Sequence, residues 1–258
     1  MQQIKAEVVK THNSAQQIYD QHCHADFEIL YILTGSTLLN LEGEQILLRE
    51  QMGIVVEPLK YHIVTGKNDR YQRLVLTFSP ESVPEAVYSR FLSRVRANAV
   101  FSEEEACRIF GRFSAILEQE DPAFEPLLQA MLTEALYALA YGDTAIQPEQ
   151  DSKRRSKLKQ VISLVDENLH RQISLEDIAG KMYMSESSLC HLFRQEMNIS
   201  LMQYILQKKM MYAKSLLEKG TPPGVAAGMV GYKNYASFYK IFQKVTGCTP
   251  GKIREKEN

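Results

Sequence analysis

The residues with the clearest chemical potential are His22, His24 and Glu28, near the start of the chain. Successive side chains of a β-strand point to opposite faces, so residues two or four apart share a face. On a continuous strand these three side chains would therefore point to one side. Imidazole nitrogens and a carboxylate suit iron, manganese, nickel or zinc, and His62 would add a fourth ligand from later in the chain.

Short β-strands must position these side chains. Runs rich in β-branched and aromatic residues predict strands at 27–33, 36–42, 44–48, 53–58, 62–66 and 72–78. Glycines and a proline punctuate the runs, and no helix-length segment separates them. This spacing favours a small barrel or jelly roll over a parallel sheet.

The spacing HxHxxxE-x6-G, which ends at Gly35 and is followed by His62, resembles the first motif and closing histidine of the cupin superfamily. In cupins these residues bind a metal inside a small barrel, so the resemblance implies a cupin-like N-terminal domain. The usual second motif is degraded here to REQMGIVVEPLKYH.

Helical periodicity replaces the strand pattern after about residue 82. One helix is predicted inside roughly 102–120 and a second at about 124–141, whose broad apolar stripe comprises Leu127, Leu128, Met131, Leu132, Ala135, Leu136 and Leu139. That stripe either packs against the barrel or forms a dimer interface, and one helix can do both. Residues 143–156 are polar and lack apolar periodicity, which indicates a linker. The helical sequence pattern resumes at Lys157.

Charge divides the chain at the same place. Residues 1–150 carry 12 Lys/Arg and 21 Asp/Glu, a net of −9, whereas residues 151–258 carry 18 and 10, a net of +8. The basic half suits a polyanion. The scattered cysteines Cys23, Cys107, Cys190 and Cys248 are expected to be reduced. No signal peptide or transmembrane run is apparent, so we expect a cytoplasmic protein that does not bind membranes.

A repeated pattern marks the basic half. Leu189, Phe193, Asn198 and Ser200 are matched 49 positions later by Phe238, Phe242, Gly247 and Thr249. An apolar pair, a residue that tolerates left-handed backbone and a capping hydroxyl together describe a helix, its end and the next helix's start. Two such units in a basic segment predict paired helix-turn-helix modules.

Residues 158–256 resemble the DNA-binding domain of the AraC family of bacterial transcriptional regulators. The matching text includes ISLEDIAGKMYMSESSLCHLFRQEMNISLMQYI, KKMMYAKSLL and VGYKNYASFYKIFQKVTGCTP. The resemblance implies two recognition helices that enter successive major-groove faces about one turn, roughly 34 Å, apart. Gly228 interrupts the first helix of the second unit, and a glycine inside a helix costs about 1 kcal/mol relative to alanine.

The resemblance also assigns DNA-binding residues. In the first unit, Ser187, Cys190 and His191 face bases, with Glu186 and Ser188 beside them; in the second unit the base-facing residues are Tyr235, Ala236, Ser237, Tyr239 and Lys240. Candidates for phosphate contacts are Arg194, Lys208, Lys209, Lys233, Lys244 and the helix starts at Ser185 and Asn234. Cys190 is equally explained as a small filler, and His191 as a phosphate contact.

The N-terminal domain has three interpretations. AraC-type N-terminal domains commonly resemble cupins that hold a small effector, so His22, His24, Glu28 and His62 are the effector-binding candidates. We favour an effector site without a metal or other cofactor; a metal-assisted site formed by the same four residues, or no pocket function, are the alternatives. Tyr31 has the opposite parity to Glu28 and should pack outside the barrel.

The expected architecture is a two-domain α+β chain. Residues 1–142 form a cupin-like β-barrel with flanking helices for effector binding and dimerisation, 143–156 a linker, and 157–258 an all-α domain with two helix-turn-helix units. We expect a homodimeric regulator that is controlled by a small molecule such as a sugar or another metabolite. The commoner behaviour of the family implies an activator that contacts RNA polymerase. The alternative is a metal-dependent cupin enzyme fused to a DNA-binding module, although no further acid–base group supports an enzyme.

Overall fold

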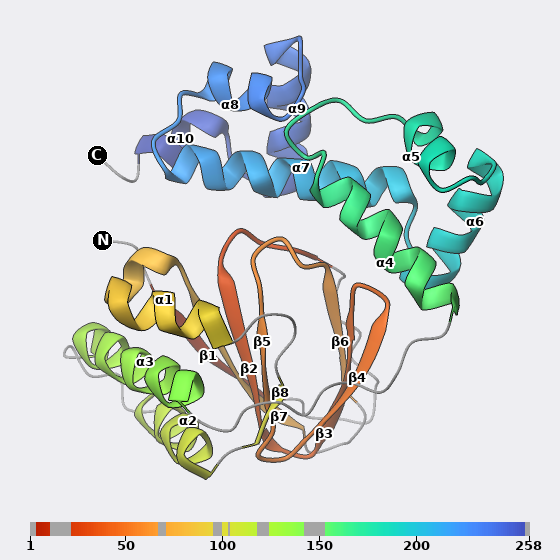
Figure 1. Cartoon of the computed structure of the whole chain (residues 1–258). Coiled ribbons are helices and arrows are strands. Elements are labelled where there is room, and N and C mark those ends of the chain that lie inside the picture. The colour runs from red at the N-terminus through yellow and green to blue at the C-terminus, as the bar shows by residue number, and fades with distance from the viewer. Residues whose placement is uncertain are drawn as a thin grey trace. The chain divides into compact units, whose positions relative to one another are not determined.

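A computed structural model describes residues 4–10, 22–66, 71–94, 100–102, 104–117, 124–141 and 153–255 (Figure 1). The chain divides into two compact units, one made mainly of residues before 150 and the other of residues from 150 onward. Most of the expected linker, residues 143–152, lies outside the described residues. Its last residues are helical, because α4 begins at Lys153 and not at Lys157.

The first unit is built on two antiparallel sheets. One has the order β1 (Lys5–Lys10), β7 (Gln72–Phe78), β2 (Phe27–Thr34), β5 (Gly53–Val56) and β8 (Val100–Phe101). The other has the order β4 (Glu44–Arg49), β3 (Ser36–Leu41) and β6 (His62–Gly66). The paired strands run antiparallel, as expected of a small barrel or jelly roll and not of a parallel sheet.

The central strand β2 is buried on both faces, because its odd-numbered positions and two of its even-numbered positions carry apolar side chains. Leu30 and Ile32 join Leu39, Leu41 and Leu48 of the other sheet in one apolar interior. The opposite face of β2 carries Phe27, Ile29 and Tyr31, which belong to a second cluster. Tyr31 therefore lies outside the interior between the sheets, as its parity predicts.

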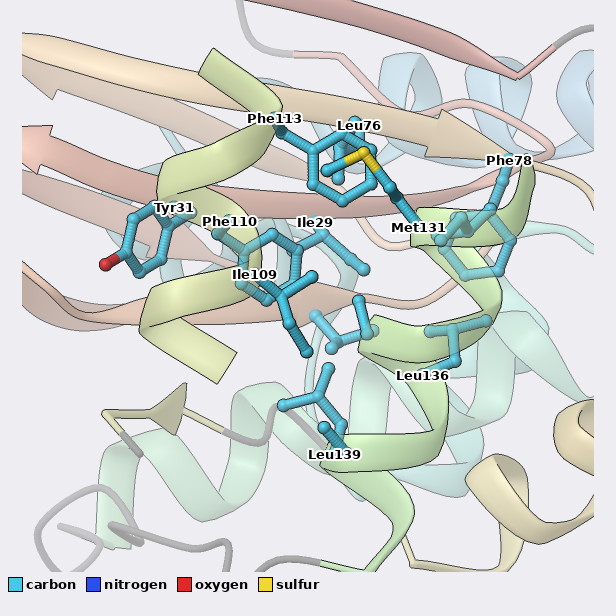
Figure 2. Close-up of a cluster of buried hydrophobic side chains, with 14 of the residues drawn as sticks. Ile29, Tyr31, Leu76, Phe78, Ile109, Phe110, Phe113, Met131, Leu136 and Leu139 are labelled. Atoms are coloured by element: carbon cyan, nitrogen blue, oxygen red, sulfur yellow. The ribbon is translucent and has the colours of Figure 1, made fainter. Parts of the chain in front are cut away.

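Three helices cover that outer face: α1 (Glu85–Arg94), α2 (Glu104–Leu117) and α3 (Phe124–Tyr141), with a short 3₁₀ turn, η1 (Pro80–Ser82), leading into α1. Figure 2 shows Tyr31 beside Phe110 of α2, and Met131, Leu136 and Leu139 of α3 directed into the same cluster. The α3 stripe is thus mostly used inside the unit: Leu132 is fully buried, and of the expected stripe only Leu127 is exposed.

The second unit is all-helical. Its helices are α4 (Lys153–Asp166), α5 (Leu175–Lys181), α6 (Glu186–Met197), α7 (Leu201–Glu218), α8 (Pro223–Met229), α9 (Tyr235–Thr246) and α10 (Pro250–Glu255). Within this unit α7 contacts α6 on one side and α8, α9 and α10 on the other.

Local sequence explains where these helices start and stop. Ser174 and Ser200 form capping boxes with Asp177 and Gln203. Asn198 and Gly247, the matched residues of the repeat, both end their helices in the left-handed conformation, with φ of 57° and 71°. Pro222 occupies the N-cap of α8 and Pro223 begins the helix, because a proline ring fits the first helical position.

Candidate DNA-binding surface and effector site

The first helix-turn-helix unit consists of α5, a turn and α6. Ser185 accepts a hydrogen bond from the Ser188 backbone N–H at 3.2 Å, which starts α6. The inner side of α6 is buried through Leu189, Leu192, Phe193 and Met197. Its outer side carries the predicted DNA-binding residues, all exposed except the half-buried Cys190: Glu186, Ser187, Ser188, His191 and Arg194.

The second unit repeats this arrangement with α8 and α9. Asn234 accepts from the Ser237 N–H at 3.1 Å and starts α9, while Phe238 and Phe242 anchor its inner side. The predicted residues of α9 are exposed: Asn234, Tyr235, Ala236, Ser237, Tyr239 and Lys240. Both outer faces therefore offer small and polar side chains to a ligand, which a helix entering a major groove requires. Their contact with DNA stays a prediction.

Two of the expected phosphate contacts are wrong. Lys208 and Lys209 on α7 are buried, with only 1% and 7% of their surface exposed. The Lys208 ammonium donates to the Asp166 carboxylate and to the Tyr204 hydroxyl. The Lys209 ammonium donates to the carbonyl oxygens of Arg171 and Val230, and burial lowers the pKa of this lysine. These lysines hold the helices together, whereas Arg194, Lys233 and Lys244 remain exposed and available to phosphates.

In the first unit the structure gathers His22, His24, Glu28 and His62, and the ligand atoms of all four lie within 4.8 Å of one another. Glu28 comes from β2 and His62 from β6, so the two sheets each contribute. His22 and His62 are paired across the backbone by N–H to carbonyl bonds of 3.2 and 3.0 Å. That pairing sets their rings 4.6 Å apart between centroids.

The inner part of this cluster is hydrogen-bonded and charged. Nε2 of His24 lies 2.8 Å from Glu28 Oε2, and Nε2 of His62 lies 3.6 Å from Glu28 Oε1. Burial alone would raise the pKa of Glu28, but the two histidines outweigh it and hold this pKa well below its usual range. Burial alone would lower the pKa of His24, yet Glu28 raises it. Glu28 is therefore a buried carboxylate ion.

The cluster forms for a different reason from the one the sequence suggests. Strand β2 begins at Phe27, so His22 and His24 precede it and do not share one continuous strand with Glu28. The bridge between His22 and His62 and a hydrogen bond of 2.8 Å from the Leu59 N–H to the His24 carbonyl place the two histidines instead.

The sequence also matches known families. Residues 6–136, slightly more than half of the chain, match the family described as AraC-like ligand binding domain, and residues 178–256 match a helix-turn-helix domain family. The chain belongs to the AraC family.

Individual relatives carry regulator names. The probable transcriptional regulator LumQ of Photobacterium leiognathi is 23% identical over 236 residues, 89% of either chain. The uncharacterized HTH-type transcriptional regulator YdiP of Escherichia coli (strain K12) is 30% identical over 152 residues, 57% of this chain, which spans half the length of YdiP. Among solved structures, ToxT from Vibrio cholerae O395 aligns over 96% of both chains with 14% identity and a TM-score of 0.42.

Two features of this AraC-family chain escaped the sequence interpretation. Tyr183 occupies the turn before α6 with a positive φ of 51° and 97% of its surface exposed, which adds an aromatic group beside the predicted DNA-binding face. The carbonyls of Asp26 and Lys60 orient His24 and His62, and backbone acceptors leave no side-chain signal. Within the described part of the chain, no helix is both long and apolar enough to span a bilayer.

Proposed function

We propose that this chain is a ligand-responsive transcriptional regulator that binds double-stranded DNA through α6 and α9. The observation that carries the proposal is the pair of capped helices with buried inner sides and exposed, small or polar outer sides. Family membership supports it, since the matched families are a ligand-binding and a helix-turn-helix domain. The relatives with regulator names favour this role over a metal-dependent cupin enzyme.

The first unit is proposed to receive the effector and the second to read DNA. An effector alters transcription only if it favours one state of the protein by binding that state more tightly. We propose that the effector site includes His22, His24, Glu28 and His62. We propose that the protein activates transcription by contacting RNA polymerase, which is the commoner behaviour in the family. We also propose that it acts in the cytoplasm.

A homodimer is proposed on the outward face of α3. Leu127, Tyr137 and Tyr141 leave between 39% and 54% of their surfaces exposed there. They follow helical spacing along one side of α3. Pairing two chains raises DNA affinity because the second binding event becomes intramolecular.

The DNA-binding proposal is tested by fluorescence anisotropy with DNA from upstream of the chain's own gene, over a series of salt concentrations. Lys240→Ala and His191→Ala should each weaken binding about 5- to 150-fold, as expected when a contact worth about 1–3 kcal/mol is lost. Neither should lower the melting temperature, because both side chains are exposed.

Lys5→Ala is the matched control, since it removes one exposed positive charge from β1. It should leave DNA affinity unchanged. Binding that is insensitive to salt, or equal losses for Lys5→Ala and Lys240→Ala, would contradict the assignment of α9 to DNA.

A further inference from the structure

The size of the His22, His24, Glu28 and His62 cluster matches the coordination sphere of a metal ion. Ligand atoms about 2.0–2.2 Å from a metal lie roughly 3 to 4.3 Å from one another, depending on the geometry. The four side chains already bring their ligand atoms within 4.8 Å of one another. The most widely separated ligand atoms would therefore have to approach by roughly 0.5 to 1.5 Å, depending on the geometry, which small side-chain rotations can supply.

The two inner imidazoles are oriented as metal ligands usually are. Nδ1 of His24 donates to the Asp26 carbonyl at 2.8 Å, and Nδ1 of His62 donates to the Lys60 carbonyl at 3.0 Å. A carbonyl oxygen only accepts, so the proton must sit on Nδ1 in both rings. Both Nε2 atoms face Glu28, and Nε2 of His24 donates a proton to that carboxylate at 2.8 Å. A bound metal ion would displace this proton and use the Nε2 lone pair instead. This outer hydrogen bond to a carbonyl fixes the tautomer of metal-bound histidines in the same way.

An independent observation is the state of His62. Its side chain is 1% exposed, and its Nε2 atom has no hydrogen-bond partner among the described residues. A buried nitrogen that lacks a partner is costly. Glu28 cannot relieve this cost when Nε2 carries a lone pair, because two acceptors do not bond. A cation between His62 and Glu28 would satisfy both groups.

We propose that His22, His24, Glu28 and His62 bind one divalent first-row transition-metal ion. Three imidazoles and one carboxylate suit zinc, nickel, cobalt, iron and manganese. Calcium and magnesium prefer all-oxygen sites, and the nitrogen-rich set therefore disfavours them. As an account of regulation this inference rests on the proposed function, because it names the ligand class of the effector site; as an account of metal binding it stands alone.

The four ligands have unequal exposure, which gives the site an inner and an outer side. The side chains of Glu28 and His62 are 8% and 1% exposed and that of His24 is 18% exposed, whereas His22 is exposed. Water can replace an outer ligand more easily than a buried one. Loss of His22 should therefore weaken metal binding less than loss of His62.

The test uses the full chain without added histidine tags, stripped with a chelator and titrated calorimetrically with Zn²⁺, Ni²⁺, Co²⁺, Mn²⁺ and Fe²⁺ in turn. We expect one ion per chain, a rise in melting temperature with the bound ion, and visible absorption bands from bound Co²⁺. Glu28→Gln and His62→Gln should each lower affinity at least about 100-fold, and His22→Ala by about 10-fold.

His170→Ala is the control, because it removes an exposed imidazole from the other unit and should change nothing. His22→Ala also guards against misfolding, since an exposed side chain can be lost without disturbing the core. Absence of binding by all five ions would overturn the proposal in favour of a metal-free His24–Glu28 ion pair. Equal losses in His170→Ala and His22→Ala would overturn it in favour of surface binding.

The DNA anisotropy assay separates this proposal from the proposed function. A chain that binds DNA and no metal refutes only the metal site. A chain that binds metal at the four residues but no DNA refutes the regulator and leaves the metal site intact.

Discussion

Gly231 is the position where one added methyl group should most disturb the second helix-turn-helix unit. It follows α8 with φ of +86°, a conformation that costs other residues about 1–2 kcal/mol. A Cβ atom there would lie 2.6 Å from the Gln172 backbone nitrogen and 2.8 Å from the Arg171 carbonyl carbon. Because backbone atoms cannot rotate away, the collision adds to the strain, and Gly231→Ala should destabilise α8 and α9 by more than about 2 kcal/mol.

Two other glycines of the same unit serve as controls. Gly220 has a similar φ of +82° but no heavy atom within 4 Å of an added Cβ, so Gly220→Ala should cost only the strain of about 1–2 kcal/mol. Gly228 lies inside α8 with equally open surroundings, and Gly228→Ala should stabilise the helix by up to about 1 kcal/mol. The three variants therefore separate collision, backbone strain and helix propensity.

Hydrogen–deuterium exchange of the full chain, read on peptides from α8 and α9, measures these effects locally. A loss of about 2 kcal/mol should speed exchange roughly 30-fold in Gly231→Ala, since 1.4 kcal/mol is a factor of ten. DNA affinity should fall with it, because α9 loses its fixed orientation. Equal effects of Gly231→Ala and Gly220→Ala would show that the Arg171–Gln172 backbone does not press on Gly231, and the reasoning would be refuted.

Two further predictions concern α7 and α3. Lys209→Met should lower the free energy of unfolding by about 2 kcal/mol, because two carbonyls lose a buried donor. Lys214→Met, which removes a half-buried lysine paired with Glu218, should lower it by under about 1 kcal/mol; urea unfolding followed by circular dichroism measures both. Tyr137→Glu on the exposed face of α3 should shift the chain toward monomer in sedimentation velocity, and the control Tyr183→Glu should not. An unchanged sedimentation coefficient for a folded Tyr137→Glu chain would show that the dimer interface lies elsewhere.

Sequence periodicity correctly predicted those helices and strands that are determined mainly by their own residues. The helix at 124–141 and the strands at 62–66 and 72–78 have the expected bounds, because their periodicity and flanking breakers are strong. Strand β1 was not expected: its sequence KAEVVK is half charged, and it is a strand because all six residues pair with β7 far along the chain. Helix α1 was likewise missed, and it is held by packing against α3.

The lysines of α7 show why charge in a sequence does not locate a surface. Two adjacent basic residues on a helix are usually solvated, so the interpretation of Lys208 and Lys209 as phosphate contacts followed the general tendency. Burial here depends on partners at residues 166, 171 and 230, none of which periodicity relates to α7. The exposed side chains of α6 and α9 were identified correctly because an apolar stripe determines which side of a helix faces inward.

The histidine cluster can regulate DNA binding only through a difference in affinity between two states of the chain. His24 and His62 are held by carbonyls before any ion binds, so their positions contribute little to such a difference. His22 is exposed and tied to His62 through backbone pairing, and coordination would therefore constrain this ligand most. Linkage requires that DNA change the metal affinity by the same factor by which metal changes the DNA affinity, commonly about 5- to 150-fold. A metal affinity that is identical with and without bound DNA would make the cluster a structural site, and the regulator's effector would have to act elsewhere.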